Sequence, residues 1–192
     1  LTYWWMDAGW YFVPGTETSI DNPAGWLYSG GWSMDTKRFP SRMRDISRYG
    51  ESVGVKTLLW FEPEIVRNTS LLKNDGSTIK PEWMIPGTDL VNLGNDDALE
   101  WIKNKIFYVM DDGGISLYRE DYGTYPLGSL RSTDVDGRRG MLENKYVQNH
   151  LKLWDEVNER FPDAVIDSCA SGGKSASSSA QRQNPCHCFR IM

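Results

Sequence analysis

Residues 115–123 read Ile-Ser-Leu-Tyr-Arg-Glu-Asp-Tyr-Gly, and the fold prediction starts from this stretch. Its first part, Ile115–Tyr118, has the length and apolar character of a short buried strand, and a carboxylate, Asp121, follows it. Two other stretches share the pattern: Tyr-Trp-Trp-Met-Asp-Ala-Gly-Trp at 3–10 and Leu-Leu-Trp-Phe-Glu-Pro-Glu at 58–64. In each, an apolar run ends at carboxylates, and in these two stretches tryptophans lie beside them.

The apolar runs predict short strands that are separated by amphipathic helices. Five runs bounded by Gly, Pro, Asp or Asn are expected to be strands: Tyr3–Met6, Val55–Phe61, Leu90–Leu93, Ile115–Tyr118 and Ala164–Ile166. Three segments have helical spacing: Pro40–Val53, Asp97–Met110 and Leu142–Arg160. Their apolar faces are expected to be Met43, Ile46, Tyr49 and Val53, then Leu99, Ile102, Ile106 and Val109, then Tyr146, His150, Trp154, Val157 and Phe161. Asn95 or Asp96 can cap the second helix.

Alternation of strands and helices predicts an α/β fold with a parallel sheet. On pattern alone, a barrel and a doubly wound sheet both remain open. Polar residues follow the strands at Asp7, Glu62, Asp121 and Asp167, as they do at the active-site end of a (β/α)₈ barrel. A whole barrel takes roughly 250 residues, so we predict a partial (β/α)₈ TIM barrel, about the first five strands. The expected division is residues 1–174 as catalytic domain and 175–192 as a divergent tail.

Composition limits the partners. The 192 residues are 40% hydrophobic and 24% charged, with a net charge of −5, which gives no reason to expect nucleic acid or a membrane as partner. The three cysteines are not expected to form a disulfide framework or a zinc site. No signal peptide is visible at Leu1, and the location stays unknown, with the cytoplasm favoured. The nine tryptophans and nine tyrosines fit either core packing or walls for sugar stacking.

The chemistry suggested by Asp121 is that of a retaining glycosidase, which uses two carboxyl groups roughly 5–5.5 Å apart. Its nucleophile has to be ionised, and a nearby cation favours that form. Arg119 and Asp121 are two residues apart, so they point to the same side of a strand. A surface ion pair between them is the second interpretation of the same pattern.

Four motifs in order carry a family resemblance: WWMDAGWY, LLWFEPE, LYREDYG and IDSCASGG. Together they resemble glycoside hydrolase family 36, the melibiase-type α-galactosidases. The resemblance implies a (β/α)₈ catalytic domain that hydrolyses terminal α-galactosyl residues with retention, without a metal or an organic cofactor. It implies small-molecule substrates such as melibiose or raffinose, and the full-length enzyme could be an oligomer.

The resemblance also assigns roles by position. Asp121 matches the nucleophile, and the residues that would contact the sugar are Asp7, Trp10, Trp60, Arg119, Cys169 and Gly172. We expect Asp7 to be a buried carboxylate that accepts hydrogen bonds from two galactose hydroxyls. For Cys169, packing as a small residue behind its strand has equal weight.

The sequence departs from the family at several positions. Ala8 follows Asp7 where a second carboxylate is common, Gly123 replaces an Asn, and Arg119 replaces a Lys, so altered specificity is expected. From Ser175 the sequence loses periodicity, and no carboxylate follows Asp167, so the acid/base Asp is expected to be absent. A slipped reading frame or a natural divergent end would explain the tail.

Several functions remain open on the sequence alone. The leading one is a piece of an α-galactosidase barrel, which alone should have little or no activity. The same fold could act on α-N-acetylgalactosaminides or transfer galactosyl groups. The chain could also be a non-catalytic galactoside-binding protein or a non-functional gene fragment.

Overall fold

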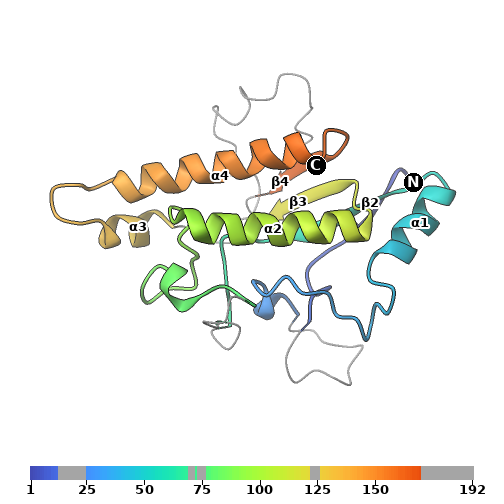
Figure 1. Cartoon of the computed structure of the whole chain (residues 1–192), viewed down its shortest axis with the longest axis horizontal. Helices are drawn as coiled ribbons and strands as arrows, with labels where there is room; N and C mark the ends of the chain where they lie inside the picture. Colours follow the sequence, from blue (N-terminus) through green and yellow to red (C-terminus); the bar gives the residue numbers. More distant parts are fainter. Residues whose placement is uncertain (13–24, 69–71, 73–76, 122–125, 170–192) are drawn as a thin grey trace.

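The structure, a computed structural model, describes residues 1–12, 25–68, 72, 77–121 and 126–169. Its centre is a four-stranded sheet in the order β1-β2-β3-β4, and every neighbouring pair is parallel. The strands are β1 (Tyr3–Met6), β2 (Lys56–Phe61), β3 (Leu117–Asp121) and β4 (Val165–Cys169). The sheet and its helices are shown in Figure 1.

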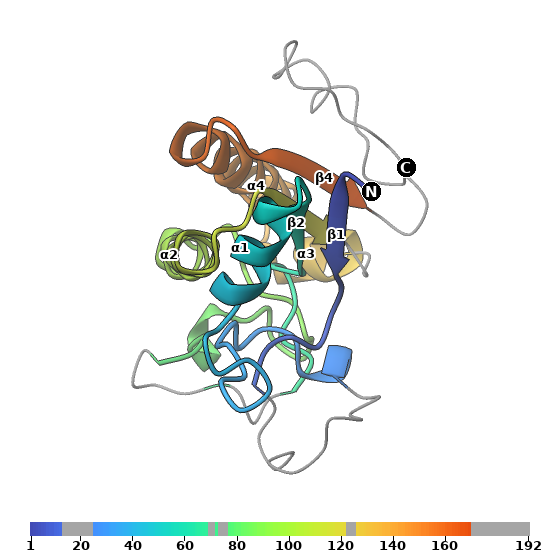
Figure 2. The same cartoon turned by 90° about the vertical axis from the view of Figure 1, so that its right-hand side faces the viewer.

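Helices follow the strands along the chain and cover one side of the sheet. The α-helices are α1 (Arg44–Ser52), α2 (Asp96–Gly113), α3 (Leu127–Thr133) and α4 (Met141–Arg160). Two short 3₁₀ helices, η1 (Gly25–Tyr28) and η3 (Pro81–Trp83), lie in the connections. Figure 2 shows α1, α2 and α4 on the same side of the strands. The predicted alternation of strands and helices is therefore present, with α3 as an additional helix inside the expected loop of residues 123–140.

The prediction of five strands was wrong at Leu90–Leu93. In the described residues this run makes only isolated antiparallel bridges, Ile65 with Leu90 and Met84 with Val91. Leu90, Val91 and Leu93 are nevertheless buried, because the connection between β2 and α2 folds into the core. An apolar run predicts that a segment is buried, but a buried segment is not necessarily a strand of the sheet.

The core lies between the sheet and the helices. Leu59 and Phe61 of β2 and Tyr118 of β3 have no exposed surface, and neither do Ile102 and Ile106 of α2. The residues predicted for the apolar face of α2 are buried as expected: Leu99, Ile102, Ile106 and Val109. Burial of this face supplies most of the stabilisation of α2, because hydrophobic burial outweighs intrinsic helix propensity in proteins.

The ends of α2 follow from its local sequence. Asn95 is the N-cap, and its side-chain oxygen accepts hydrogen bonds from the backbone N–H groups of Asp97 (2.9 Å) and Ala98 (3.3 Å). Gly114 ends the helix in the left-handed conformation at φ 63°, which a residue with a Cβ adopts less readily. The predicted cap is therefore confirmed.

The predicted face of α1 was right in its first half and wrong in its second, because Met43 is fully buried and Ile46 packs against the core. Tyr49 and Val53 are 73% and 59% exposed, whereas the buried residues of α1 are Ser47 and Gly50. The Ser47 hydroxyl donates to the Gly113 carbonyl at 2.5 Å, and a Cβ on Gly50 would lie 2.8 Å from the Val55 carbonyl oxygen. Small residues thus let α1 approach the neighbouring backbone closely at Ser47 and Gly50, while Tyr49 and Val53, which the periodicity predicted to be buried, are exposed.

A truncation of the core on α2 tests the fold. We expect Ile102→Ala to lower the free energy of unfolding by about 2–5 kcal/mol, because it leaves a cavity beneath the sheet. Chemical denaturation measures this change. Val147→Ala on α4, at a side chain that is 50% exposed, is the control and should stay within about 0.5 kcal/mol of the wild type. Equal effects of the two substitutions would contradict the placement of the core.

Candidate active site at the carboxyl ends of the strands

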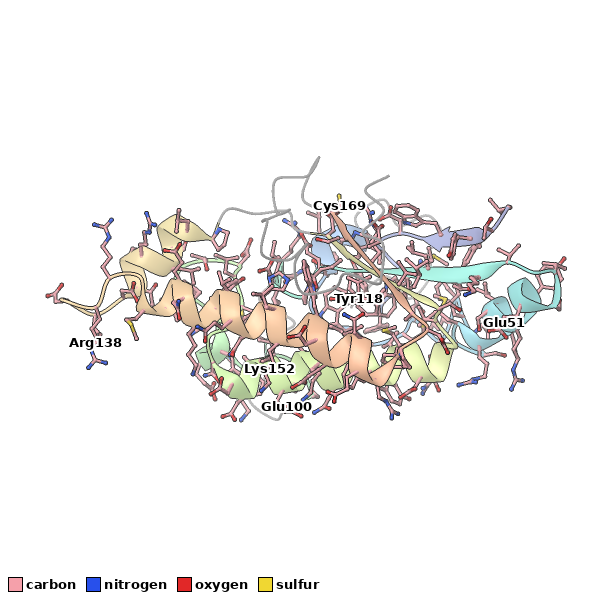
Figure 3. All side chains as sticks on the ribbon, turned by 90° about the horizontal axis from the view of Figure 1, so that it is seen from above. Glu51, Glu100, Tyr118, Arg138, Lys152 and Cys169 are labelled. Atoms are coloured by element: carbon pink, nitrogen blue, oxygen red, sulfur yellow. The ribbon has the colours of Figure 1, made fainter. Side chains whose placement is uncertain are left out.

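The parallel register aligns side chains from neighbouring strands at one edge of the sheet. Trp60 of β2 pairs with Arg119 of β3, which pairs with Asp167 of β4. Two residues further along, Asp121 pairs with Cys169. Because side chains alternate along a strand, these five residues share one face of the sheet. Figure 3 shows Cys169 at the end of β4, on the side of the sheet away from α4.

Asp121 ends β3 and is partly exposed. The indole N–H of Trp60 donates to Asp121 Oδ2 at 3.3 Å. Trp60 itself is only 5% exposed, so its ring is fixed by the surrounding core. The Trp60 indole thus orients one oxygen of a partly exposed carboxylate at the end of β3.

Arg119 forms an ion pair with Asp167 of β4, and the side chains are 14% and 9% exposed. Its guanidinium also lies over the Trp5 ring, 4.3 Å from the centroid, a cation–π distance. The ion pair therefore joins adjacent strands in a shielded position. It differs from the surface pair between Arg119 and Asp121 that was the second interpretation of the sequence.

Asp7 follows β1 and is one residue beyond Met6, which pairs with Leu59. This places Asp7 next to the row that contains Trp60. The expectation of a buried carboxylate was wrong: Asp7 is exposed, and its Oδ1 accepts the Ala8 N–H at 2.7 Å. The reason is that β1 pairs with β2 alone among the described strands, so it lies at an edge of the sheet.

Two further predicted sugar contacts have different surroundings. Trp10 has no exposed surface, and its indole N–H donates to the Trp60 carbonyl at 2.8 Å. In this position Trp10 acts on the site by holding Trp60. Cys169 is partly exposed on the face that carries Asp121, which favours the pocket-lining interpretation of the two that were open. Gly172 and Gly123 lie outside the described residues.

A second carboxyl group, that of Glu62, lies close enough to Asp121 to be influenced by its charge. Glu62 follows β2, is 2% exposed, and accepts hydrogen bonds from Ser29 Oγ at 2.9 Å and Arg67 Nη2 at 2.5 Å. Burial raises the pKa of Glu62, and the negative charge of Asp121 adds to this effect. The strand-end pattern pointed to Glu62, but nothing in the sequence indicated Ser29 and Arg67, which come from connecting segments.

Among the described residues, no group of three or more His, Cys, Asp or Glu side chains could hold a metal ion. None of the described helices combines the length and the apolar character that a membrane crossing requires.

The chain matches a protein family and several curated proteins. The melibiase family profile matches residues 2–180. The α-galactosidase Mel36A of Lactobacillus acidophilus is 24% identical over 88% of this chain and 23% of its own length. An Escherichia coli α-galactosidase is 23% identical over 75% of this chain and 20% of its length. The chain therefore spans about a quarter or less of the curated relatives it matches.

Solved structures show the same fold. The Lactobacillus brevis α-galactosidase superposes with a TM-score of 0.71 at 21% identity, covering 90% of this chain and 23% of that one. The Geobacillus stearothermophilus α-galactosidase AgaA in complex with stachyose gives a TM-score of 0.68 at 21% identity, covering 88% and 23%. The four-stranded sheet is thus part of a (β/α)₈ barrel, and the chain belongs to the melibiase family.

Proposed function

We propose that this chain carries the nucleophile and part of the sugar-binding site of a retaining α-galactosidase. The observation that carries the proposal is the arrangement of Asp121: it ends β3, accepts the Trp60 indole N–H, and lies one row beyond the Arg119–Asp167 pair. A barrel of this kind has its active site at this edge of the sheet.

The proposed reaction begins when an Asp121 oxygen attacks the anomeric carbon of an α-galactoside. The glycosidic bond breaks, and its electron pair leaves with the departing oxygen, which takes a proton from an acid. Water then attacks the galactosyl–Asp121 ester, and galactose leaves with the original configuration. Asp121 is suited to the first step because its carboxylate is oriented by Trp60 and is not enclosed by the core.

The proton donor is proposed to lie outside these 192 residues, because no Asp or Glu follows Asp167. Glu62 is a poor candidate for this role. Both of its oxygens already accept hydrogen bonds, Oε1 from Arg67 and Oε2 from Arg67 and Ser29. A carboxyl group engaged in this way holds its surroundings together and has no free oxygen to present to a leaving group.

For the sugar, the proposal assigns a hydroxyl acceptor. The exposed carboxylate of Asp7 can accept hydrogen bonds from ligand hydroxyls. Because AgaA was solved with stachyose and with raffinose, α-galactosyl oligosaccharides of this type are the proposed substrates. Cys169 is proposed to line the same pocket.

A second candidate is a galactoside-binding protein without catalysis. The observation that favours it is the absence of any carboxylate after Asp167. Both candidates bind galactose, so the two are separated by whether Asp121 reacts with a sugar.

Covalent trapping provides that separation. We expect 5-fluoro-α-D-galactopyranosyl fluoride to label Asp121: the Asp121 oxygen forms the bond to the anomeric carbon, and fluoride leaves with the electron pair without needing an acid. The 5-fluoro group disfavours the oxocarbenium-like transition states of both steps, so the ester accumulates. Intact-mass analysis should show one added fluorogalactosyl group, and peptide mapping should place it at Asp121.

Two variants control the trapping experiment. Asp121→Asn keeps the size of the side chain and removes the nucleophile, so it should not be labelled. Asp155→Asn, at an exposed position of α4, should be labelled like the wild type. An unlabelled wild type that still binds galactose would support the binding protein, and a label on another residue would refute the role of Asp121.

Substitution of Asp7 tests the sugar-binding assignment. Asp7→Asn should weaken methyl α-galactoside binding by about 10- to 100-fold, because hydrogen bonds to a charged group contribute about 1.5–3 kcal/mol. Isothermal titration calorimetry measures the affinities. Methyl α-glucoside, with its equatorial O4, should bind weakly to both proteins, and Asp155→Asn should bind like the wild type. An unchanged affinity in Asp7→Asn would remove Asp7 from the site.

A further inference from the structure

A buried cluster of ionisable groups lies directly behind Asp121. Glu120, the residue before it, points to the opposite face of β3 and is 1% exposed. Its carboxylate forms an ion-pair contact with His150 of α4. His150 makes a second such contact with Glu64, which follows β2 and is 1% exposed. Figure 3 shows Tyr118 of the same strand in the layer between the sheet and α4. The proposed reaction does not use this cluster.

The contacts of Glu120 hold it rigidly. Its Oε2 accepts the Tyr118 hydroxyl at 2.5 Å and the Trp154 indole N–H at 3.0 Å, while its Oε1 contacts His150 Nε2. Tyr118 lies on β3 itself, and Trp154 lies one turn after His150 on α4. The Glu120 carboxylate therefore joins the end of β3 to α4 through charge-assisted hydrogen bonds, which are the stronger kind.

Helix α4 is in turn fixed against α2. Asn149, next to His150, donates from Nδ2 to the Leu93 carbonyl at 2.7 Å and to Asp96 Oδ1 at 3.0 Å. Asp96 is the first residue of α2. Helix α4, which carries His150, is thus hydrogen-bonded to α2 and to the segment before it at the residue next to His150. This contact restrains the position of α4.

The contacts of His150 bear on its protonation. Nε2 faces Glu120 and Nδ1 lies 3.3 Å from Glu64 Oε1, so both ring nitrogens face carboxyl oxygens. While both carboxyls are ionised, a neutral imidazole with its single N–H would turn a lone pair toward one of them, whereas an imidazolium presents an N–H to each. The contacts therefore favour the charged ring.

The directions of the pKa shifts of His150 and Glu120 agree with a charged ring, whereas that of Glu64 opposes it. Burial disfavours the charge on His150, but Glu120 and Glu64 outweigh burial and raise the pKa of His150 well above its usual value. Burial also opposes ionisation of Glu120, yet the charge and hydrogen bond of His150, with the Tyr118 and Trp154 donors, leave the pKa of Glu120 lowered. For Glu64, burial prevails and its pKa is raised, with His150 and Tyr146 acting in the opposite direction.

We propose that His150 is a positioning residue, which as an imidazolium ties Glu120 and Glu64 to α4 and so fixes the end of β3 from which Asp121 projects. This inference rests on the proposed function of Asp121. The groups that face His150 are Glu64 from the segment after β2 and Glu120 from β3. Tyr118 and Tyr146 are the other titratable groups that contact these carboxyls or act on them. None of these residues reaches the sugar side of the sheet; they act through the backbone of β3.

The charge state of His150 can be read directly, because the sequence has only two histidines, His150 and His187. In nitrogen-15 NMR spectra of the whole chain, both ring nitrogens of His150 should show the imidazolium signature at neutral pH. His187→Gln removes the second set of signals and completes the assignment. A neutral tautomer with Nδ1 or Nε2 unprotonated would overturn the proposal.

The stability contribution of this charge has a defined pH window. Because the folded pKa of His150 is raised, its stabilisation is complete below about pH 6.5 and is lost as pH rises through the folded value. The lowered pKa of Glu120 has the opposite sign: its stabilisation is present above about pH 4.5 and is lost as pH falls through its folded value. We expect the denaturation midpoint of wild type to exceed that of His150→Gln between these limits, with the difference shrinking at alkaline pH. A difference that does not vary with pH would contradict a charged His150.

The link to Asp121 is tested by the rate of trapping with 5-fluoro-α-D-galactopyranosyl fluoride. His150→Gln cannot donate to both carboxylates, so its limiting labelling rate should fall on the order of 10- to 100-fold, while the affinity for methyl α-galactoside stays unchanged. Glu64→Gln provides a second route if His150→Gln does not fold. Glu64→Gln should lower the pKa of His150. The labelling rate is expected to fall at alkaline pH as His150 loses its proton, and the pH midpoint of this fall should move down by the same amount.

The outcomes separate the two proposals. A wild type that is never labelled refutes the function of Asp121 and the positioning role that depends on it. A labelled wild type refutes only the positioning role if His150→Gln is labelled at the same rate. The same conclusion follows for Glu64→Gln if two pH midpoints move by different amounts. One is the midpoint of the His150 titration in the NMR spectra, and the other is the midpoint of the fall in labelling rate at alkaline pH. His187→Gln is the matched control and should be labelled like the wild type.

Discussion

The parallel pairing of β2, β3 and β4 determines which side chains meet in this molecule. Because the three strands are in register, Trp60, Arg119 and Asp167 form one row, and Asp121 and Cys169 form another on the same face. A shift of one residue in any strand would exchange that face with the core. The buried side chains of Leu59, Phe61 and Tyr118 oppose such a shift, so the hydrophobic layer holds the polar site in place.

Strand β3 illustrates how adjacent carboxylates are given different tasks. Glu120 is buried, and its negative charge is stabilised by contacts with a tyrosine hydroxyl, an indole N–H and a histidine ring. Asp121 is partly open and has the Trp60 indole N–H on one oxygen. A buried charge is tolerated only when hydrogen-bonded and paired, so Glu120 is suited to fixing the backbone. The open carboxylate is the one that can meet a substrate, as the proposed mechanism requires.

Much of this arrangement follows from local sequence, and the rest depends on distant contacts. The bounds of β1, the cap at Asn95 and the buried face of α2 are set by neighbours along the chain, so the sequence predicts them. Arg119 finds its partner in Asp167, on another strand, and no local pattern specifies that pairing.

The exposure of Asp7 depends on which strands lie beside β1. The face of α1 was predicted correctly at Met43 and Ile46 and wrongly at Tyr49 and Val53, because close backbone contact at Ser47 and Gly50 replaces hydrophobic burial there. His150 was expected only as part of an apolar face, and its carboxylate partners come from β3 and from the segment after β2.

The central claim is that Asp121 faces the anomeric carbon of a bound galactoside. A crystal structure of the chain with an α-galactoside tests it most directly. We expect the anomeric carbon to lie about 3–3.5 Å from an Asp121 carboxylate oxygen, the distance of a near-attack geometry. The sugar hydroxyls should lie within hydrogen-bonding distance of Asp7. A galactoside bound away from the carboxyl ends of the strands, or with its anomeric carbon turned from Asp121, would contradict the claim.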